Sequence, residues 1–491
     1  MQSELTLEEI QDFKGKYPKQ IWFLFLSEMW ERFSFYGMRG MLTIFLVEQL
    51  HIGEKEANLK YGAIQAFVYA LAFVGGLFAD KILGFRKSIF WGGFLMIVGS
   101  FILAFSPHQL FYIGISFTIV GSGFFKPNIS TIVGTLYKEG DARRDAGFSL
   151  FYSGINIGGL LGGAACIWVA DKISWNAAFS LAGIFMILGL CIFIFTQRTL
   201  GPIGKVPVKK DGETNPKWYE YAVYIGSLLF IPFILLLIRN TQYTDLFMYI
   251  IGPITLLYVI YEMKNYTREE NEKLVAALIF IFFSIFFWAF FEQSGGSLSL
   301  FARYNLKGEL LGFNPNQINN SSNNLFVVIL SPLIGLIWLW LYKRNKEPNT
   351  VIKFGMSFLF LGASFFIFYA TRFFASAEGF ASLPLFTFAY FVITLGELCL
   401  SPIGLSIMTK LSPKPLWGVM MGIWFLASAY GQYVAGILGA GMASDDAKAS
   451  LPAKLILYTD GYKQLGIYAL VAGIVLIILS PVVRNLMREV K

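Results

Sequence analysis

Long apolar stretches, separated by short polar segments, recur along the whole chain. Each is close to the ~20 residues that a helix needs to cross the hydrocarbon core of a bilayer. They predict fourteen membrane-spanning helices, and because this number is even, both chain ends are expected on one side of the membrane. The predicted helices cover residues 21–47, 62–82, 88–106, 110–132, 147–170, 175–197, 218–238, 244–262, 274–297, 323–342, 351–371, 383–409, 416–440 and 464–483.

The longest polar linker in the middle of the chain, residues 197–217, is rich in Gly, Pro and Lys. Such a segment is typical of a boundary between two bundles. The next two helices carry no charge in mid-span and predict a peripheral hairpin, inserted between halves that are related by an approximate repeat. The chain is therefore predicted to be an all-α polytopic membrane protein. Its predicted parts are a six-helix bundle at 1–197, a linker with a two-helix insertion at 198–273, and a second six-helix bundle at 274–491.

The composition agrees with this class. Of the 491 residues, 56% are hydrophobic and only 14% are charged, and the mean hydropathy is +0.60. The three Cys lie in apolar runs without CxxC spacing, and the sequence shows no metal-ligand cluster, P-loop or nucleophile elbow. An enzyme, a disulfide framework and a metal or other cofactor are not expected.

Positive charges indicate the orientation. Placing the N-terminus in the cytoplasm puts more than twice as many of the 39 Lys and Arg residues inside as outside, as the positive-inside rule requires. The first twenty residues are polar and do not read as a secretory signal peptide, so the first helix is expected to direct insertion. We expect an integral protein of a bacterial inner membrane with both termini cytoplasmic.

The first predicted helix carries four charges within an apolar span: Glu28, Glu31, Arg32 and Arg39. A charge at that depth costs several kcal/mol unless it is paired or faces water. Helical spacing places this set on one side of the helix. These side chains are expected to face the interior of a bundle.

Further charges lie inside later spans. Lys126 lies on the fourth helix, Glu292 on the first helix of the second half and Glu397 on its fourth. The first half thus offers mainly cations and the second half offers anions. This pattern predicts a binding site for a small zwitterion, with its carboxylate on the Arg and Lys side and its ammonium on the Glu side.

Several separated motifs resemble one known family. The motifs ExxERFSFYG at 28–37, FYxxINxG at 151–158 and FFEQ at 290–293 are similar to those of the proton-dependent oligopeptide transporter (POT, or peptide transporter) family. The segment GGLFADKILGFRK at 75–87 resembles a loop of the major facilitator superfamily, to which that family belongs. Bacterial members also carry a central two-helix insertion. The resemblance implies a major facilitator fold, with two six-helix bundles and a hairpin.

The resemblance also implies roles for individual residues. Proton coupling is expected from Glu28, Glu31 and Arg32, and gating from Arg39 paired with Glu292 and from Asp80. Substrate binding is expected from Arg32, Tyr36, Arg39, Tyr69, Lys126, Asn156, Trp288, Glu292, Asn323, Glu397, Ser401 and Trp424.

The resulting functional hypothesis is a proton-coupled symporter that imports di- and tripeptides by alternating access. Its expected partners are these peptides, protons and membrane lipid, with no nucleic acid, and we expect it to function as a monomer. The predicted helix 62–82 holds no His, unlike that of animal members of the family, so a His-based proton step is not expected. His51 and His108 are both predicted in outer loops.

Two other functions remain open at this point. One is transport of another small anion or zwitterion, such as nitrate or a drug-like acid, and the other is peptide sensing without transport. Purely structural roles are also possible for single residues. Glu31 and Arg32 are compatible with a structural ion pair, and Glu292 is compatible with helix packing. The aromatic positions are equally compatible with core packing.

Overall fold

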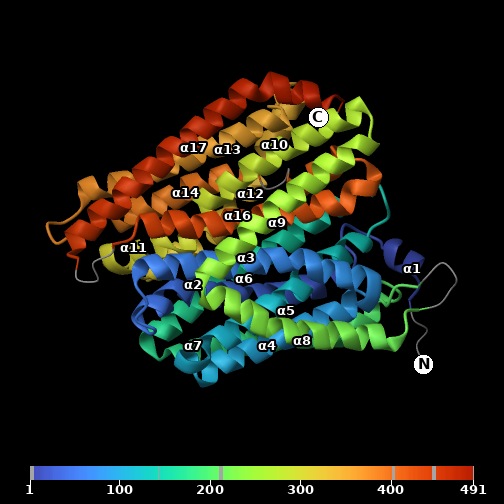
Figure 1. The fold of residues 1–491 in the computed structure, drawn as a ribbon, viewed down its shortest axis with the longest axis horizontal. Coiled ribbons are helices and arrows are strands. Elements are labelled where there is room, and N and C mark those ends of the chain that lie inside the picture. Colours follow the sequence, from blue (N-terminus) through green and yellow to red (C-terminus); the bar gives the residue numbers. More distant parts are fainter. Residues whose placement is uncertain (1–4, 142, 209–213, 401–403, 445–448, 490–491) are drawn as a thin grey trace. The chain divides into compact units, whose positions relative to one another are not determined.

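The computed structural model describes residues 5–141, 143–208, 214–400, 404–444 and 449–489, and its regular structure there is helical (Figure 1). Short 3₁₀ or π turns extend several helices, and strand pairing within these residues is limited to three isolated bridges. The α-helices are α1 (Leu7–Gln11), α2 (Gln20–Glu48), α3 (Glu54–Phe78), α4 (Phe85–Phe105), α5 (Pro107–Thr135), α6 (Arg143–Lys172), α7 (Trp175–Thr196), α8 (Lys217–Arg239), α9 (Thr241–Glu262), α10 (Arg268–Phe291), α11 (Ser297–Asn305), α12 (Pro315–Lys343), α13 (Thr350–Ala370), α14 (Leu383–Leu400), α15 (Gly404–Lys410), α16 (Trp417–Gly441) and α17 (Leu451–Met487).

Thirteen helical stretches among the described residues are long and apolar enough to cross a membrane. Helix α2 is not among them, because of its charges, but its 29 residues would extend about 43 Å at a rise of 1.5 Å each. The predicted all-α polytopic membrane protein is confirmed. Each predicted stretch lies mainly in helix, although the stretch 274–297 includes the 3₁₀ turn Glu292–Gly295. Residues 401–403 of the stretch 383–409 lie outside the described part.

The chain forms two compact units. Unit 1 comprises Met1–Met41 and Phe67–Arg239, and unit 2 comprises Leu42–Ala66 and Asn240–Lys491. The C-terminal end of α2 and the N-terminal part of α3 therefore belong to unit 2, and the insertion is divided, with α8 in unit 1 and α9 in unit 2. The six-two-six division with its internal repeat stays a prediction.

Close backbone approach holds unit 1 together. Helix α4 packs on α5 and α7, α6 packs on α7, and α8 packs on α5. A Cβ added at Gly121 of α5 would lie 2.6 Å from the carbonyl oxygen of Gly92 on α4, so only glycine fits there. Small residues of this kind replace the hydrophobic effect as the basis of helix packing within a membrane.

Phenylalanine side chains fill the core of unit 2. Helix α13 packs on α14 and α17, α10 packs on α16 and α17, and α12 packs on α14. The rings of Phe280, Phe354, Phe358, Phe365 and Phe386 are fully buried in this core.

Polar contacts attach each helix of the insertion to its own unit. In unit 1, Lys87 Nζ lies 2.6 Å from a carboxylate oxygen of Glu220 on α8, and Trp91 Nε1 donates to Ser227 Oγ at 2.9 Å. In unit 2, the hydroxyl of Tyr433 donates to Asp245 of α9 at 2.6 Å. Most apolar side chains of both helices are exposed. Their pairing as a peripheral hairpin stays a prediction.

Several helix boundaries differ from the prediction. Helix α12 begins at Pro315 rather than 323, α17 begins at Leu451 rather than 464, and α11 was not predicted. The prediction that His108 lies in a loop was wrong, because this residue lies in the first turn of α5. The helix begins with Pro107, whose missing N–H costs nothing at a position where no helical partner exists.

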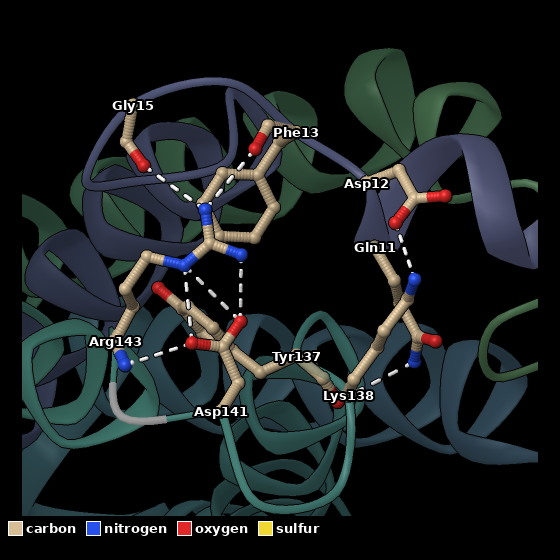
Figure 2. Close-up of polar contacts among 8 residues, drawn as sticks. All are labelled: Gln11, Asp12, Phe13, Gly15, Tyr137, Lys138, Asp141 and Arg143. Atoms are coloured by element: carbon tan, nitrogen blue, oxygen red, sulfur yellow. Dashed lines mark hydrogen bonds and ion pairs between the residues drawn. The ribbon is translucent and has the colours of Figure 1, made fainter.

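The N-terminal segment is part of unit 1 (Figure 2). Helix α1 begins with a capping box in which Thr6 and Glu9 satisfy each other's backbone N–H groups. Its Ile10 is 2% exposed and packs into the core of the unit. Two further polar contacts tie the segment down: Gln11 Nε2 donates to the Thr135 carbonyl at 3.0 Å, and Asp12 forms an ion pair with Lys138.

Arg143 fastens the end of this segment. Its guanidinium donates to the carbonyl oxygens of Phe13 and Gly15, each at 3.1 Å, and lies over the Phe13 ring (Figure 2). The carboxylate of Asp141 accepts from the same guanidinium at 2.7 Å. These hydrogen bonds hold the pKa of Asp141 below its usual value. We call this set, Phe13, Gly15, Asp141 and Arg143, the N-terminal clasp.

The clasp predicts the effect of Asp141→Asn. This change keeps the shape but removes the charge that orients Arg143, so amide hydrogen exchange in residues 5–17 should become faster at pH 7. Because the folded pKa is depressed, the wild-type clasp should hold at neutral pH and loosen only as the pH falls below about 4. Glu139→Gln, at an exposed site in the same loop, is the matched control. Equal exchange in the two variants would contradict the role of the clasp.

Candidate functional site

Glycines on α6 and a polar contact on α7 set the position of helix α2. A Cβ at Gly158 of α6 would collide with the carbonyl oxygen of Met29, and one at Gly162 with that of Phe33. From the other side, the hydroxyl of Ser27 donates to the carbonyl oxygen of Gly189 on α7 at 2.8 Å. Helix α2 therefore lies against bare backbone. Gly158 is the glycine of the FYxxINxG motif, which accounts for its place in that motif.

The charged residues of α2 form a buried cluster. Arg32 Nε lies 3.0 Å from Glu28 Oε1 and also contacts Glu31 Oε2. The three side chains are at most 2% exposed. One guanidinium thus pairs with two carboxylates that are buried away from water. The desolvation free energy of this arrangement is high unless further positive charge is nearby.

Lys126 of α5 supplies that charge, since it acts electrostatically on both carboxylates. It is part-buried and is followed by Pro127 within the same helix. Its ammonium lies 4.0 Å from the centroid of the Tyr69 ring. Two cations and two carboxylates of unit 1 therefore lie within interaction range of one another.

Aromatic rings accompany the arginines as well. Arg32 lies over the Phe35 ring at 5.2 Å, and Arg39 lies over the Tyr36 ring at 5.6 Å. A cation over an aromatic face gains about 0.5–2 kcal/mol, depending on how far it is desolvated. Of the predicted aromatic positions, Tyr36 and Tyr69 thus accompany charged groups of unit 1.

In unit 2, Glu397 of α14 is 7% exposed. The side-chain amide of Asn323 on α12 donates to Glu397 Oε2 at 2.8 Å and to the hydroxyl oxygen of Thr394 at 3.1 Å. The two predicted binding residues Asn323 and Glu397 are therefore in direct contact. Their contact presents an oriented carboxylate, which suits a positively charged ligand group.

Glu292 begins the 3₁₀ turn Glu292–Gly295, which interrupts the helical stretch between α10 and α11, and it is 3% exposed. Trp288, one turn earlier, is part-buried and packs edge-on against Phe287 and Phe291. Trp424 of α16 is buried in the same Phe-rich core. Both tryptophans thus contribute to core packing, whatever further role they have.

Three predicted residues have other surroundings. Asn156 is buried and donates to the Tyr152 carbonyl of its own helix at 2.9 Å. Asp80 is exposed in the π turn Ala79–Leu83, and the neighbouring Arg86 donates to the carbonyls of Gly201 and Ile203. Ser401 lies outside the described residues.

Unit 1 thus brings together Glu28, Glu31, Arg32 and Lys126, and unit 2 brings together Asn323 and Glu397. Arg39 and Glu292 belong to different units, and their pairing stays a prediction. Residue-level reasoning missed polar residues beside Glu397, among them Thr394. The polar run NQINNSS at 316–322, which the predicted helix 323–342 left out, was a signal for the part on α12, whereas no signal in the sequence pointed to Thr394.

Comparisons with known proteins decide the family. Residues 86–453 match the family model described as PTR2, POT family. The chain belongs to the POT family. It is 34% identical to the peptide transporter YePEPT of Yersinia enterocolitica subsp. palearctica serotype O:3 (strain YE-P4), over 95% of this chain and 94% of the relative. It is 29% identical to dipeptide and tripeptide permease B of Xenorhabdus bovienii (strain SS-2004), over 96% and 97% of the two chains.

A solved structure agrees with this assignment. A peptide transporter POT in complex with sulfate matches with a TM-score of 0.82 and 30% identity, over 99% of this chain and 100% of that chain. The protein is a POT-family membrane transporter and not an enzyme. The resemblance drawn from the motifs at 28–37, 151–158 and 290–293 is confirmed at the level of family and fold.

The packing of α2 predicts the effect of Gly158→Ala. The added methyl would meet the Met29 carbonyl and Arg32 Cβ, so the free energy of unfolding should fall by about 1–3 kcal/mol. Gly226→Ala on α8 is the control, because nothing lies within 4 Å of its added Cβ. Thermal unfolding in detergent should show a lower melting temperature for the first variant only. An unchanged melting temperature would show that α2 does not depend on this contact.

Proposed function

We propose that this POT-family protein imports di- and tripeptides together with protons by alternating access. The observation that carries the proposal is the buried cluster of Glu28, Glu31 and Arg32 with Lys126 nearby. Charges held at this cost in a membrane helix belong to an ion or substrate pathway as a rule. The names of the relatives, which include a peptide transporter and a dipeptide and tripeptide permease, supply the substrate class.

Proton coupling follows from the balance of charge in unit 1. Without substrate, two cations offset the carboxylates of Glu28 and Glu31. A peptide carboxylate that binds Arg32 and Lys126 would compete for these cations and leave the buried carboxylates in excess. Because burial penalises unpaired charge, uptake of a proton at Glu28 or Glu31 would restore the balance, and peptide and proton would be carried together.

The second end of the peptide would bind unit 2. We propose that the ammonium group binds Glu397, while Asn323 and Asn156 hold the peptide backbone. All small peptides share an ammonium and a carboxylate, so recognition of both ends accepts many side chains. In this scheme Tyr36, Tyr69, Trp288 and Trp424 shape the side-chain space.

Alternating access requires gates. We propose that Arg39 pairs with Glu292 in the closed state of the outer gate, and that Asp80 contributes to the inner gate. With both termini in the cytoplasm, as the Lys and Arg distribution favours, net positive charge would move inward. The membrane potential contributes about 2.3 kcal/mol per charge per 100 mV to this movement.

Uptake into proteoliposomes tests the proposal. A labelled dipeptide should accumulate when an inward proton gradient is imposed and should not accumulate without one. Blocking the amino terminus or amidating the carboxyl terminus should each reduce competition by at least about tenfold, the loss of one charge-assisted contact. Competition by nitrate, or by a non-peptide acid, instead of by peptides would favour a different anion. Tight peptide binding without any flux would favour a sensor.

Glu31→Gln tests whether Glu31 carries the proton. This variant should lose gradient-driven accumulation, because its side chain no longer takes up the proton, but it should retain exchange of internal for external peptide. Glu378→Gln, at an exposed position, should leave both activities unchanged. Driven uptake by Glu31→Gln at the wild-type rate would show that Glu31 is not the proton carrier.

A further inference from the structure

The helical stretch is interrupted after α10 by the 3₁₀ turn Glu292–Gly295. In a membrane each backbone carbonyl of such a turn needs a hydrogen-bond donor within the protein. Two side chains of unit 2 provide one: Thr43 Oγ1 donates to the Gly295 carbonyl at 2.5 Å, and Asn319 Nδ2 donates to the Ser294 carbonyl at 2.8 Å. The turn that begins with Glu292 is thus held from outside its own helix.

Asn319 has a second contact, which leads away from the turn. Its Oδ1 accepts a hydrogen bond from the Tyr390 hydroxyl of α14 at 2.6 Å. Both side chains are 1% exposed. The amide of Asn319 therefore joins α14 to the turn through one buried side chain.

A second contact between α12 and α14, with the hydrogen bond in the opposite direction, lies one helical turn further along both helices. Asn323 follows Asn319 by four residues and Thr394 follows Tyr390 by four, so each pair lies on one helix face. Asn323 donates to Thr394 and to Glu397, and Thr394 donates to the Tyr390 carbonyl at 2.7 Å. We call these five residues, Asn319, Asn323, Tyr390, Thr394 and Glu397, the α12–α14 ladder.

We propose that the α12–α14 ladder couples the occupancy of Glu397 to the turn that carries Glu292, with Asn319 and Tyr390 as positioning residues. The inference rests on the proposed function, in which Glu397 receives the peptide ammonium. An ammonium at Glu397 would compete with the Asn323 amide, which would then turn toward Thr394. In a buried network a broken hydrogen bond is not replaced by water, so the neighbouring contacts adjust together. The adjustment would reach Ser294 through Tyr390 and Asn319.

Tyr390→Phe tests the link, because it removes one hydroxyl and leaves the Asn323 contact to Glu397 in place. Peptide affinity should stay within about twofold of wild type, whereas gradient-driven uptake should fall about tenfold, the usual effect of one lost buried hydrogen bond. The matched control is Tyr433→Phe, which loses a hydrogen bond of the same 2.6 Å length to Asp245. It should leave the ratio of uptake to affinity unchanged.

A readout without substrate separates this inference from the proposed function. In the wild-type background, Glu397→Gln should change the amide hydrogen exchange of residues 292–296, because it weakens the acceptor at one end of the ladder. The same substitution in a Tyr390→Phe background should leave that exchange unchanged. This measurement stands even if the wild-type protein transports no peptide, an outcome that would contradict the proposed function alone.

Two results would overturn the inference. One is that Tyr390→Phe keeps the uptake and affinity of the wild type, and that Glu397→Gln leaves amide exchange at residues 292–296 unchanged in both backgrounds. The other is an equal loss of stability, affinity and uptake in Tyr390→Phe and Tyr433→Phe, which would assign the Tyr390 hydroxyl a packing role only. Non-additive effects of Tyr390→Phe and Asn319→Ala on uptake would support the inference, since the two changes break the same link.

Discussion

The dominant physical constraint on this protein is the cost of holding charge and unpaired polar groups away from water. The candidate sites of the two units meet it differently. In unit 1, cations and carboxylates compensate one another around Arg32, and aromatic rings cover the cations. In unit 2, the Asn323 amide donates to Glu397, while the Asn319 amide and the Thr43 hydroxyl donate to carbonyls of the turn Glu292–Gly295. The charge balance of the ionic cluster in unit 1 would change when a charged ligand binds. The amide network in unit 2 would instead change by reorienting its hydrogen bonds.

How far the sequence predicts the structure follows from the same constraint. Apolar runs reveal helices that face lipid or a Phe-rich core, and those were predicted well. Prediction failed where polar residues are buried because they pair with one another. The start of α12 was missed since Asn316, Gln317 and Asn319 resemble a loop in hydropathy, yet all three are buried. The start of α17 was missed for a similar reason: its Lys454 and Tyr458 bind the carboxylate of Glu54.

The sequence predicted which charged residues are candidates for the site, but it did not predict which residues they contact. Four charges on one apolar helix single out α2 from the amino-acid sequence alone, and the contact between Arg32 and Glu28 follows from their i,i+4 spacing, whereas the contact between Arg32 and the adjacent Glu31 does not. The contact between Asn323 and Glu397 does not, because the two residues are 74 positions apart. The role of Gly158 was likewise hidden, since a glycine in sequence does not show which backbone approaches it.

The division of the chain at Met41 and Ala66 has a mechanical consequence. Helices α2 and α3 continue without interruption from one compact unit into the other. A continuous helix strongly resists stretching but bends at modest cost. Any change in the relative position of the two units must therefore bend these two helices. Turnover would then depend on the bending stiffness of α2 and α3, to which Gly40, next to one end of the division, contributes.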